Sequence, residues 1–438
     1  MHTIKNCKFI LLFLCIPALF LNACVTGKGY KNIPSAQRAP ASSAPGEISS
    51  PAGDSKQQAS FRIPDNLKQV QDFPPTKVAI LLPLSGKHAD IGNAMLNAAQ
   101  MALFDVGYPS FSILPRDTQG TPDGARKAAK DAAREGAELV IGPLFATSVK
   151  AVQPVVRSRG INMIAFSTDW TLAGRNTFIM GFMPFDQLER VAEFAGRNNV
   201  KTIGILSPDN SYGQIVANSF SRLAPQYGMQ VTDNVSFHPH SPNLAPTIRA
   251  FTHFDARKAQ DALASRPYDA VLMPVGGEDA RSIANLLTHN NLPPRSVIRI
   301  GTGLLDDPAL ATEQNLEGAW FAAPSPISRK NFENKYQRTF GKKAPRLTSL
   351  AYDATALAAT LARQGFSTGD RPAFGADAIA NPNGFAGIDG IFRFRSNGTV
   401  ERGLAVLSYQ RGRIVVLDDA PITFVKPMPP KQPEISSN

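Results

Sequence analysis

The sequence predicts an α/β fold in which strands and helices alternate around parallel sheets. The apolar run Val78–Leu82 suits a parallel strand buried on both faces, and apolar residues then recur at helical spacing from about residue 90 to residue 104. Between these two segments, Pro83–Gly86 ends the strand and turns the chain. The basic unit is therefore a strand, a polar loop and a helix.

The same unit recurs along the chain. Further apolar runs at Leu139–Ile141, Thr202–Leu206, Ala270–Met273 and Val297–Ile300 each end in a loop of small and polar residues, as in Gly142–Ser148 and Ser207–Gly213. In an open parallel sheet, the loops at the carboxyl ends of the strands line the ligand crevice. These loops therefore predict a binding protein rather than an enzyme.

The first 23 residues are typical of an export signal. Lys5 and Lys8 precede the apolar run Phe9–Leu21, which is shorter than the ~20 residues that a membrane-spanning helix needs. The segment Leu21–Cys24 resembles a bacterial lipobox, whose cysteine is lipidated and becomes the first mature residue. The alternative is an ordinary cleaved signal with an incidental cysteine.

Lipidation of Cys24 would attach the mature chain to a membrane, and Val25 after it favours the outer membrane by resemblance to lipoprotein sorting rules. Cys7 and Cys15 leave with the signal, so we expect no internal disulfide. Residues 26–75 are rich in Ser, Ala, Pro and Gly and predict a disordered tether with a span of about 40 Å. The alternative there is a small folded piece.

The remaining ~350 residues exceed one ordinary core and suit two lobes, followed by a Pro-rich tail at 426–438. The formal charge of the chain is +11, and removal of the signal, which carries two lysines and no acid, leaves +9. This charge suits an anionic partner. The basic residues are scattered, however, without the clusters that mark a nucleic-acid surface, so we expect no nucleic-acid binding.

Several hydroxyls lie where helices begin at the predicted crevice, whose unpaired N–H groups favour an anion such as a carboxylate. They are Ser85, Thr147, Ser148, Ser167 and Thr168. Each of them could instead cap a helix.

Two further side chains are candidates. Tyr212 could cover a ligand with its ring, or pack on the surface of its own lobe. Glu278 could meet an ammonium group, or stabilise the first turn of a helix, as acids do at that position.

Signals of catalysis are poor. The chain has no G-x-S-x-G, Walker, H-E-x-x-H or G-x-G-x-x-G motif. His238 and His240 flank Pro239 in a polar connection, which favours a solvated loop over a metal site. We therefore expect no enzyme activity, no metal and no cofactor, with a hydrolase of unrecognised site as the remaining enzyme hypothesis.

Taken in order, several segments make the chain resemble the type I periplasmic binding proteins, in particular the leucine-isoleucine-valine receptors. These segments are Pro83–Gly86, Gly142–Ser148, Ser211–Gly213, Ala351–Ala354 and Gly387–Phe394. The resemblance implies two Rossmann-like α/β lobes joined by a hinge of three crossovers. It places lobe one at 76–185 and 320–388, and lobe two at 186–319 and 389–425.

The resemblance carries over only part of the amino-acid site. Ala146 stands where the family uses a hydroxyl to hold the α-carboxylate, while Tyr212 matches the aromatic residue of lobe two. The acid for the α-ammonium should follow Val297–Ile300, but no acid occurs there before Asp306. Because a buried ammonium needs a partner, an ordinary amino-acid receptor would require Glu278 or Asp306 in that role.

A related branch, the lipid-anchored activators of penicillin-binding proteins, is similar at Gly181–Gln187 and in the lipobox with its tether. The best-known members carry a helical-repeat domain ahead of this one, where we expect only the tether of about 50 residues here. The first hypothesis is thus a non-enzymatic lipoprotein that binds a penicillin-binding protein or a muropeptide-like ligand and regulates peptidoglycan synthesis. The alternative is a receptor that delivers an amino acid to an ABC permease.

Overall fold

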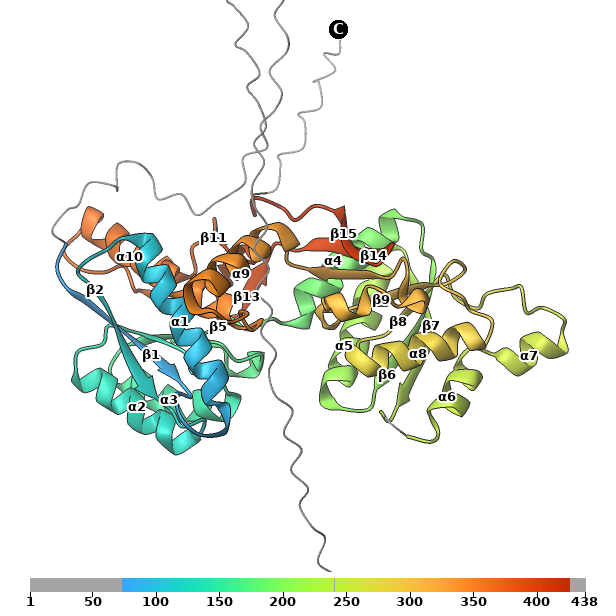
Figure 1. Ribbon diagram of the computed structural model, residues 1–438, viewed down its shortest axis with the longest axis horizontal. Coiled ribbons are helices and arrows are strands. Elements are labelled where there is room, and N and C mark those ends of the chain that lie inside the picture. Colours follow the sequence, from blue (N-terminus) through green and yellow to red (C-terminus); the bar gives the residue numbers. More distant parts are fainter. Residues whose placement is uncertain (1–72, 240, 426–438) are drawn as a thin grey trace, which may run out of the picture. The chain divides into compact units, whose positions relative to one another are not determined.

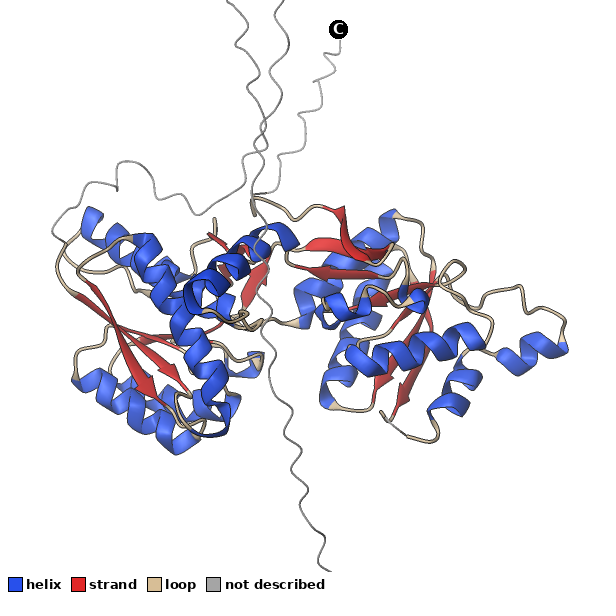
Figure 2. Cartoon of the chain, in the orientation of Figure 1, coloured by secondary structure: helices blue, strands red, loops and turns tan. Residues whose placement is uncertain are grey.

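The computed structural model describes residues 73–239 and 241–425. The predicted signal, the predicted lipidated Cys24, the Pro-rich tail and the tether up to residue 72 lie outside the described residues. The last three residues assigned to the tether are described, and Phe73 packs against the core of the first lobe, so the predicted end of the tether at residue 75 is too late. Figures 1 and 2 show two sheets, each flanked by helices.

The first sheet consists of five parallel strands in the order β2-β1-β3-β4-β5. The strands are β1 (Thr76–Leu82), β2 (Phe111–Asp117), β3 (Leu139–Ile141), β4 (Asn162–Ala165) and β5 (Thr177–Ile179). The helices of this lobe are α1 (Ala89–Val106), α2 (Pro122–Arg134), α3 (Ala146–Ser158), α9 (Pro326–Phe340), α10 (Thr348–Thr368) and α11 (Ala376–Ile379). The apolar run predicted as a buried strand is β1, and Val78–Leu82 is fully buried there.

The second sheet has seven strands in the order β15-β14-β10-β9-β8-β6-β7. The parallel strands are β6 (Thr202–Pro208), β7 (Gln230–Phe237), β8 (Ala270–Leu272), β9 (Ile298–Gly301) and β10 (Trp320–Ala323), and the antiparallel ones are β14 (Ala405–Gln410) and β15 (Arg413–Asp418). Its helices are α4 (Pro184–Arg197), α5 (Ser211–Leu223), α6 (Leu244–Phe251), α7 (Phe254–Ala259) and α8 (Gly277–His289).

The two parallel arrangements have the same topology. The first sheet has the order β2-β1-β3-β4-β5, and the parallel part of the second has the order β7-β6-β8-β9-β10. If the strands of each lobe are numbered from 1 to 5 along the chain, both orders are 2-1-3-4-5, which is a doubly wound order. This confirms the prediction of two Rossmann-like α/β lobes. The order reverses between β1 and β3 and again between β6 and β8, and such reversals open a crevice at the carboxyl ends of the strands.

A small antiparallel sheet completes the first lobe. It consists of β11 (Phe385–Gly387), β12 (Gly390–Phe394) and β13 (Val400–Arg402). Phe392, Phe394 and Val400 of this sheet belong to the apolar core of the first lobe. Ile179 of β5 also forms a bridge with Thr399, beside β13.

The chain therefore crosses between the lobes three times, from β5 to α4, from β10 to α9 and from β13 to β14. Two of the crossovers differ from the expected boundaries. Strand β10 pairs with β9 and β14, so the second crossover follows Ala323 rather than residue 319. Strands β12 and β13 pack in the first lobe, so the third crossover follows Arg402 rather than residue 388.

Glycines allow the first turn of several helices to lie against the preceding loop. A Cβ on Gly92 of α1 would lie 2.0 Å from the carbonyl oxygen of Pro83, and one on Gly213 of α5 would lie 2.0 Å from that of Pro208. A Cβ on Gly124 of α2 would likewise lie 2.3 Å from the carbonyl oxygen of Thr118. These approaches fix the loops that follow β1, β2 and β6.

Gly92→Ala should destabilise the protein by roughly 1–3 kcal/mol, as overpacking does. Helix propensity alone predicts the opposite, a gain of about 1 kcal/mol for alanine inside a helix. Urea unfolding measures the difference. Gly174→Ala is the control, because nothing lies within 4 Å of its Cβ position. Equal stability of the two variants would contradict the prediction.

Candidate binding site

A cavity of about 710 Å³ lies where the three crossovers meet the loops of both lobes. It is lined by Thr168–Thr171 after β4, by Ser211, Tyr212 and Ile215 of α5, by Gly303, Leu304 and Asp306 after β9, by Arg346 before α10, and by the crossover residues Phe182–Pro184, Asp186, Gln187, Ala322–Pro324, Arg402 and Leu404. The volume suits a small organic molecule.

Tyr212 forms part of the lobe-two wall. Asn210 caps α5 by accepting a hydrogen bond from the Gly213 amide at 2.9 Å, which fixes the start of the helix. The Tyr212 hydroxyl lies 2.8 Å from Thr302 Oγ1. Burial raises the pKa of Tyr212, so the ring remains a neutral phenol.

The loop after β4 supplies the lobe-one wall. Asp169 accepts hydrogen bonds from the amide of Thr171 at 3.1 Å and from its hydroxyl at 2.6 Å, which begins the short helix Trp170–Leu172. The Asp169 amide donates to Ser167 Oγ at 3.0 Å. Trp170 packs edge-on against Phe185, with the ring centroids 4.7 Å apart.

Of the eight residues predicted to line the cleft, only Thr168 and Tyr212 line this cavity. Ser85 instead donates to Asp117 at 2.6 Å, beside the ends of β1 and β2. Ser167 is buried and serves the turn at Asp169. Glu278 is 70% exposed in the first turn of α8 and pairs with Arg281 at 3.3 Å, which agrees with its helix-stabilising interpretation.

The start of α3 also differs from the sequence interpretation. Phe145 occupies the N-cap position, so Ala146, Thr147 and Ser148 lie inside the first turn and neither hydroxyl caps the helix. Thr147 is exposed. Ser148 is fully buried, and its Oγ has no hydrogen-bond partner among the described residues.

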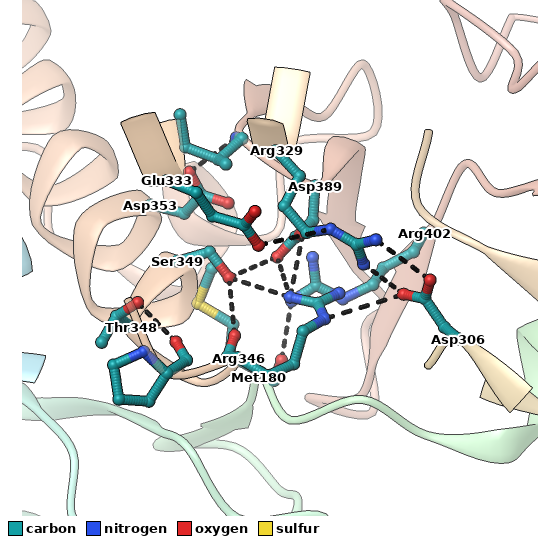
Figure 3. A network of polar contacts seen from close by, with 12 residues as sticks. Met180, Asp306, Arg329, Glu333, Arg346, Thr348, Ser349, Asp353, Asp389 and Arg402 are labelled. Carbon is teal, nitrogen blue, oxygen red and sulfur yellow. Dashed lines mark hydrogen bonds and ion pairs between the residues drawn. The ribbon is translucent and has the colours of Figure 1, made fainter. Parts of the chain in front are cut away.

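Two arginines that the sequence analysis did not single out line the cavity. Their guanidinium carbons lie over the ring of Phe182, that of Arg346 at 4.0 Å from the centroid and that of Arg402 at 4.9 Å. Arg402 donates from Nη2 to the carbonyl oxygen of Met180 at 2.8 Å. Arg346 donates from Nη1 to Ser349 Oγ at 3.1 Å and pairs with Asp389 at 3.1 Å (Figure 3).

Behind these arginines lies a buried pair of carboxyl groups. Burial and the neighbouring Asp389 raise the pKa of Asp353 to about 7. Burial also acts on Asp389, but Arg346 and Arg402 outweigh it and hold the pKa of this carboxyl below its usual range. Asp389 therefore carries the negative charge, while Asp353 titrates near neutral pH.

Ion pairs join the two lobes beside the cavity. Asp306, after β9, pairs with Arg329 of α9 through two contacts, one of them at 3.0 Å from Nη2 to Oδ1 (Figure 3). Asp186 of α4 pairs with Arg395 at 3.0 Å and accepts from the Arg402 amide at 3.0 Å. Each contact links a lobe-two element to a segment of the first lobe.

A sequence signal for this cluster existed. Asp353 interrupts the apolar stretch Leu350–Leu357, and a charge inside such a stretch requires a buried partner. The signal does not identify the partner. Arg346 and Arg402 stand alone in the sequence and carry no local pattern.

Within residues 73–239 and 241–425, no group of three or more His, Cys, Asp or Glu residues is arranged to hold a metal ion. No helix in the same part of the chain is long and apolar enough to cross a membrane.

Asp353 should make stability depend on pH. Its folded pKa of about 7 lies above the ordinary value of about 3.9, so the folded state binds the extra proton between these values. Stability is therefore fully present below about pH 4 and is lost as the pH rises through 7. From about pH 5.5 to 8, this group should lower the free energy of unfolding by on the order of 2 kcal/mol.

Urea unfolding of Asp353→Asn checks this, since the variant should show a smaller decrease over that range. Asp131→Asn is the control, because Asp131 is a surface carboxyl on α2 whose pKa is lowered by Lys127 and Arg134. An unchanged pH dependence in Asp353→Asn would show that another group titrates.

Comparisons with known proteins agree with this architecture. A putative branched-chain amino acid ABC transporter from Rhodospirillum rubrum is 18% identical, with 78% of this chain and 100% of that chain covered and a TM-score of 0.68. An ABC transporter substrate-binding protein from Desulfitobacterium hafniense in complex with Leu is 16% identical, with coverages of 78% and 100% and a TM-score of 0.58. A solute-binding protein from R. palustris in complex with benzoate is 18% identical, with coverages of 78% and 96% and a TM-score of 0.53. At these identities, the likeness shows the fold.

An uncharacterized protein of Rickettsia prowazekii (strain Madrid E) is 22% identical over 173 residues, which are 40% of this chain and 46% of that protein. The match thus spans about half of the relative's length. A family model described as periplasmic binding protein matches residues 75–413. The chain belongs to the periplasmic binding protein family, with the type I fold of the leucine-binding proteins.

Proposed function

We propose that this protein is a non-enzymatic ligand-binding protein of the bacterial envelope, and that a small organic solute binds in the cavity at the crossovers. The observation that carries the proposal is the composition of the cavity wall. Both lobes and all three crossovers contribute residues to it. A solute in the cavity would therefore contact all three crossovers that connect the lobes.

This arrangement couples binding to the hinge. A ligand shifts a conformational equilibrium by its difference in affinity for the two states. Because Phe182, Ala323 and Arg402 lie at different crossovers and line one cavity, a bound solute would favour the arrangement of lobes that touches it most.

Uptake of an amino acid has less support than binding of another small solute. Neither acid considered for an α-ammonium is available, because Glu278 is exposed and paired with Arg281, and Asp306 is paired with Arg329. The neighbours in complex with Leu and with benzoate support a small solute without selecting one.

Activation of a penicillin-binding protein remains a second candidate, favoured by this incomplete amino-acid site. The similarity to these activators at Gly181–Gln187 has a second explanation. Phe182, Met183 and Pro184 line the cavity, and Asp186 accepts a hydrogen bond from the Arg402 amide across the two lobes. An ABC permease is the partner if the solute is imported. Lipidation of Cys24 and an outer-membrane location belong to the same proposal, since a lipid anchor keeps such a protein at its membrane.

Ser211→Trp should weaken solute binding at least tenfold, because Ser211 lines the cavity and an indole there would occupy part of its volume. Thermal unfolding against amino acids, carboxylates and muropeptides provides the measurement. A solute at about a hundred times its Kd stabilises the folded state by about 2.7 kcal/mol. Asn218→Trp is the control, since Asn218 is exposed on the same helix and is not part of the wall. Equal shifts in both variants would contradict a site in the cavity.

Co-purification from membranes tests the partner. If the protein is an activator, a penicillin-binding protein should remain attached to the full chain and to Ser211→Trp alike, because the outer surface of the lobes would make the contact. Recovery of an ABC permease, with attachment dependent on solute, would instead favour the uptake receptor.

A further inference from the structure

We propose that the solute is an apolar monocarboxylate without an α-ammonium group, and that Arg346 binds its carboxylate. The inference rests on the proposed function and names the ligand class of the same cavity. It follows from three features of the wall: an accessible and oriented arginine, the acids near it that are shared with other arginines, and the pairing of two of the three lining acids with cations.

Arg346 is the accessible cation of the cavity. Its side chain is 33% exposed, whereas Arg402 is only 6% exposed. The ring of Phe182 and the contacts of Nη1 with Ser349 and Asp389 hold the guanidinium in place. A donor that is already oriented loses little conformational entropy when it binds a carboxylate.

The remaining nitrogens of Arg346 are available. Nε lies 4.0 Å from Asp306 Oδ2, which is beyond hydrogen-bond distance, and Nη2 has no hydrogen-bond partner among the described residues. Nε and Nη2 form one edge of the planar guanidinium, and such an edge binds a carboxylate through two parallel hydrogen bonds. Asp306 does not compete strongly, because its charge is taken by Arg329.

The acids near the wall are shared among several arginines. Arg346 and Arg402 both face Asp389. Asp306 and Asp186 also lie near this pair, but each forms its closer ion pair with another arginine, Arg329 or Arg395. A carboxylate from the solute would therefore give Arg346 a second close partner.

An ammonium group finds little to bind. Three acids line the cavity, and two of them already pair with cations, Asp186 with Arg395 and Asp306 with Arg329. Asp169 has no cation partner among the described residues, and both hydrogen bonds from Thr171 fall on its Oδ1. An ammonium group would therefore depend on Asp169 alone. Because an unpaired buried ammonium is costly, we expect the cavity to favour acids that lack one.

The rest of the wall suits an apolar body. Trp170, Ile215, Leu304 and Leu404 line the cavity, and the hydroxyl of Tyr212 is engaged with Thr302. The carboxylate of the solute would therefore be the main polar group that the cavity recognises, through Arg346.

Two matched sets of probes test the inference by calorimetry on the purified full chain. The first set shares one branched skeleton: 4-methylpentanoate carries the carboxylate alone, leucine carries the carboxylate and the ammonium, and 3-methylbutylamine carries the ammonium alone. The second set is 3-phenylpropanoate, phenylalanine and 2-phenylethylamine. In at least one set, the carboxylate should bind ten times or more tightly than the amino acid, and the amine should not bind.

Arg346→Gln should weaken binding of that carboxylate at least tenfold, and Arg346→Lys should give an intermediate loss, because lysine keeps the charge without the two-bond edge. Arg281→Gln is the control, since this arginine pairs with Glu278 and Glu313 away from the cavity. The comparison of probes on the unaltered protein stands even if Arg346→Gln does not fold.

The alternative outcomes separate the two proposals. Tighter binding of leucine or phenylalanine than of the deaminated acid, lost in Asp169→Asn, would overturn the carboxylate inference and leave the proposed function intact. Binding of only another class of solute, abolished by Ser211→Trp, would do the same. Binding of no probe in either set would also overturn the inference, and absence of any solute effect in the thermal panel would remove the proposed function with it.

Discussion

The need to pair buried charges at the crossovers constrains the rest of this structure. A buried charge without a partner costs several kcal/mol, so segments that carry such charges must meet. Asp186 at the start of α4 meets Arg395, and Asp306 after β9 meets Arg329 on α9. Both pairs join segments that belong to different lobes. These ion pairs hold the ends of the two sheets beside the three crossovers.

The same charges form the wall of the cavity. Asp306, Arg346 and Arg402 line it, and Figure 3 shows the polar contacts that they make beside it. Asp186 also lines it and pairs with Arg395. The electrostatics of the site and the mechanics of the hinge are therefore properties of one cluster. A charge brought by a solute would act on groups that also join the two lobes, such as Asp306 and Asp186.

Sequence reasoning placed the candidate residues at the carboxyl ends of the strands, and the structure brings only some of them to the cavity. Tyr212 and Thr168 line the cavity because they follow strand ends, as the topology requires. Ser85 does not line the cavity, and its hydroxyl donates to Asp117. Ser148 is buried inside α3, because Phe145 is the N-cap of that helix. Local competition for hydrogen bonds decides such cases, and residue type alone does not show it.

By itself, the sequence determined the strand–loop–helix units and the two lobes, because apolar periodicity and turn residues act over a few neighbouring positions. The same pattern predicts a ligand at the carboxyl edge of the strands. Only the tertiary structure decided which charges remain free at that edge. Arg346 and Asp389 are 43 positions apart and pair at 3.1 Å, and Asp306 and Arg329 approach from different lobes. Charge pairing depends on distance in space, and the folded chain sets that distance only after every crossover is in place.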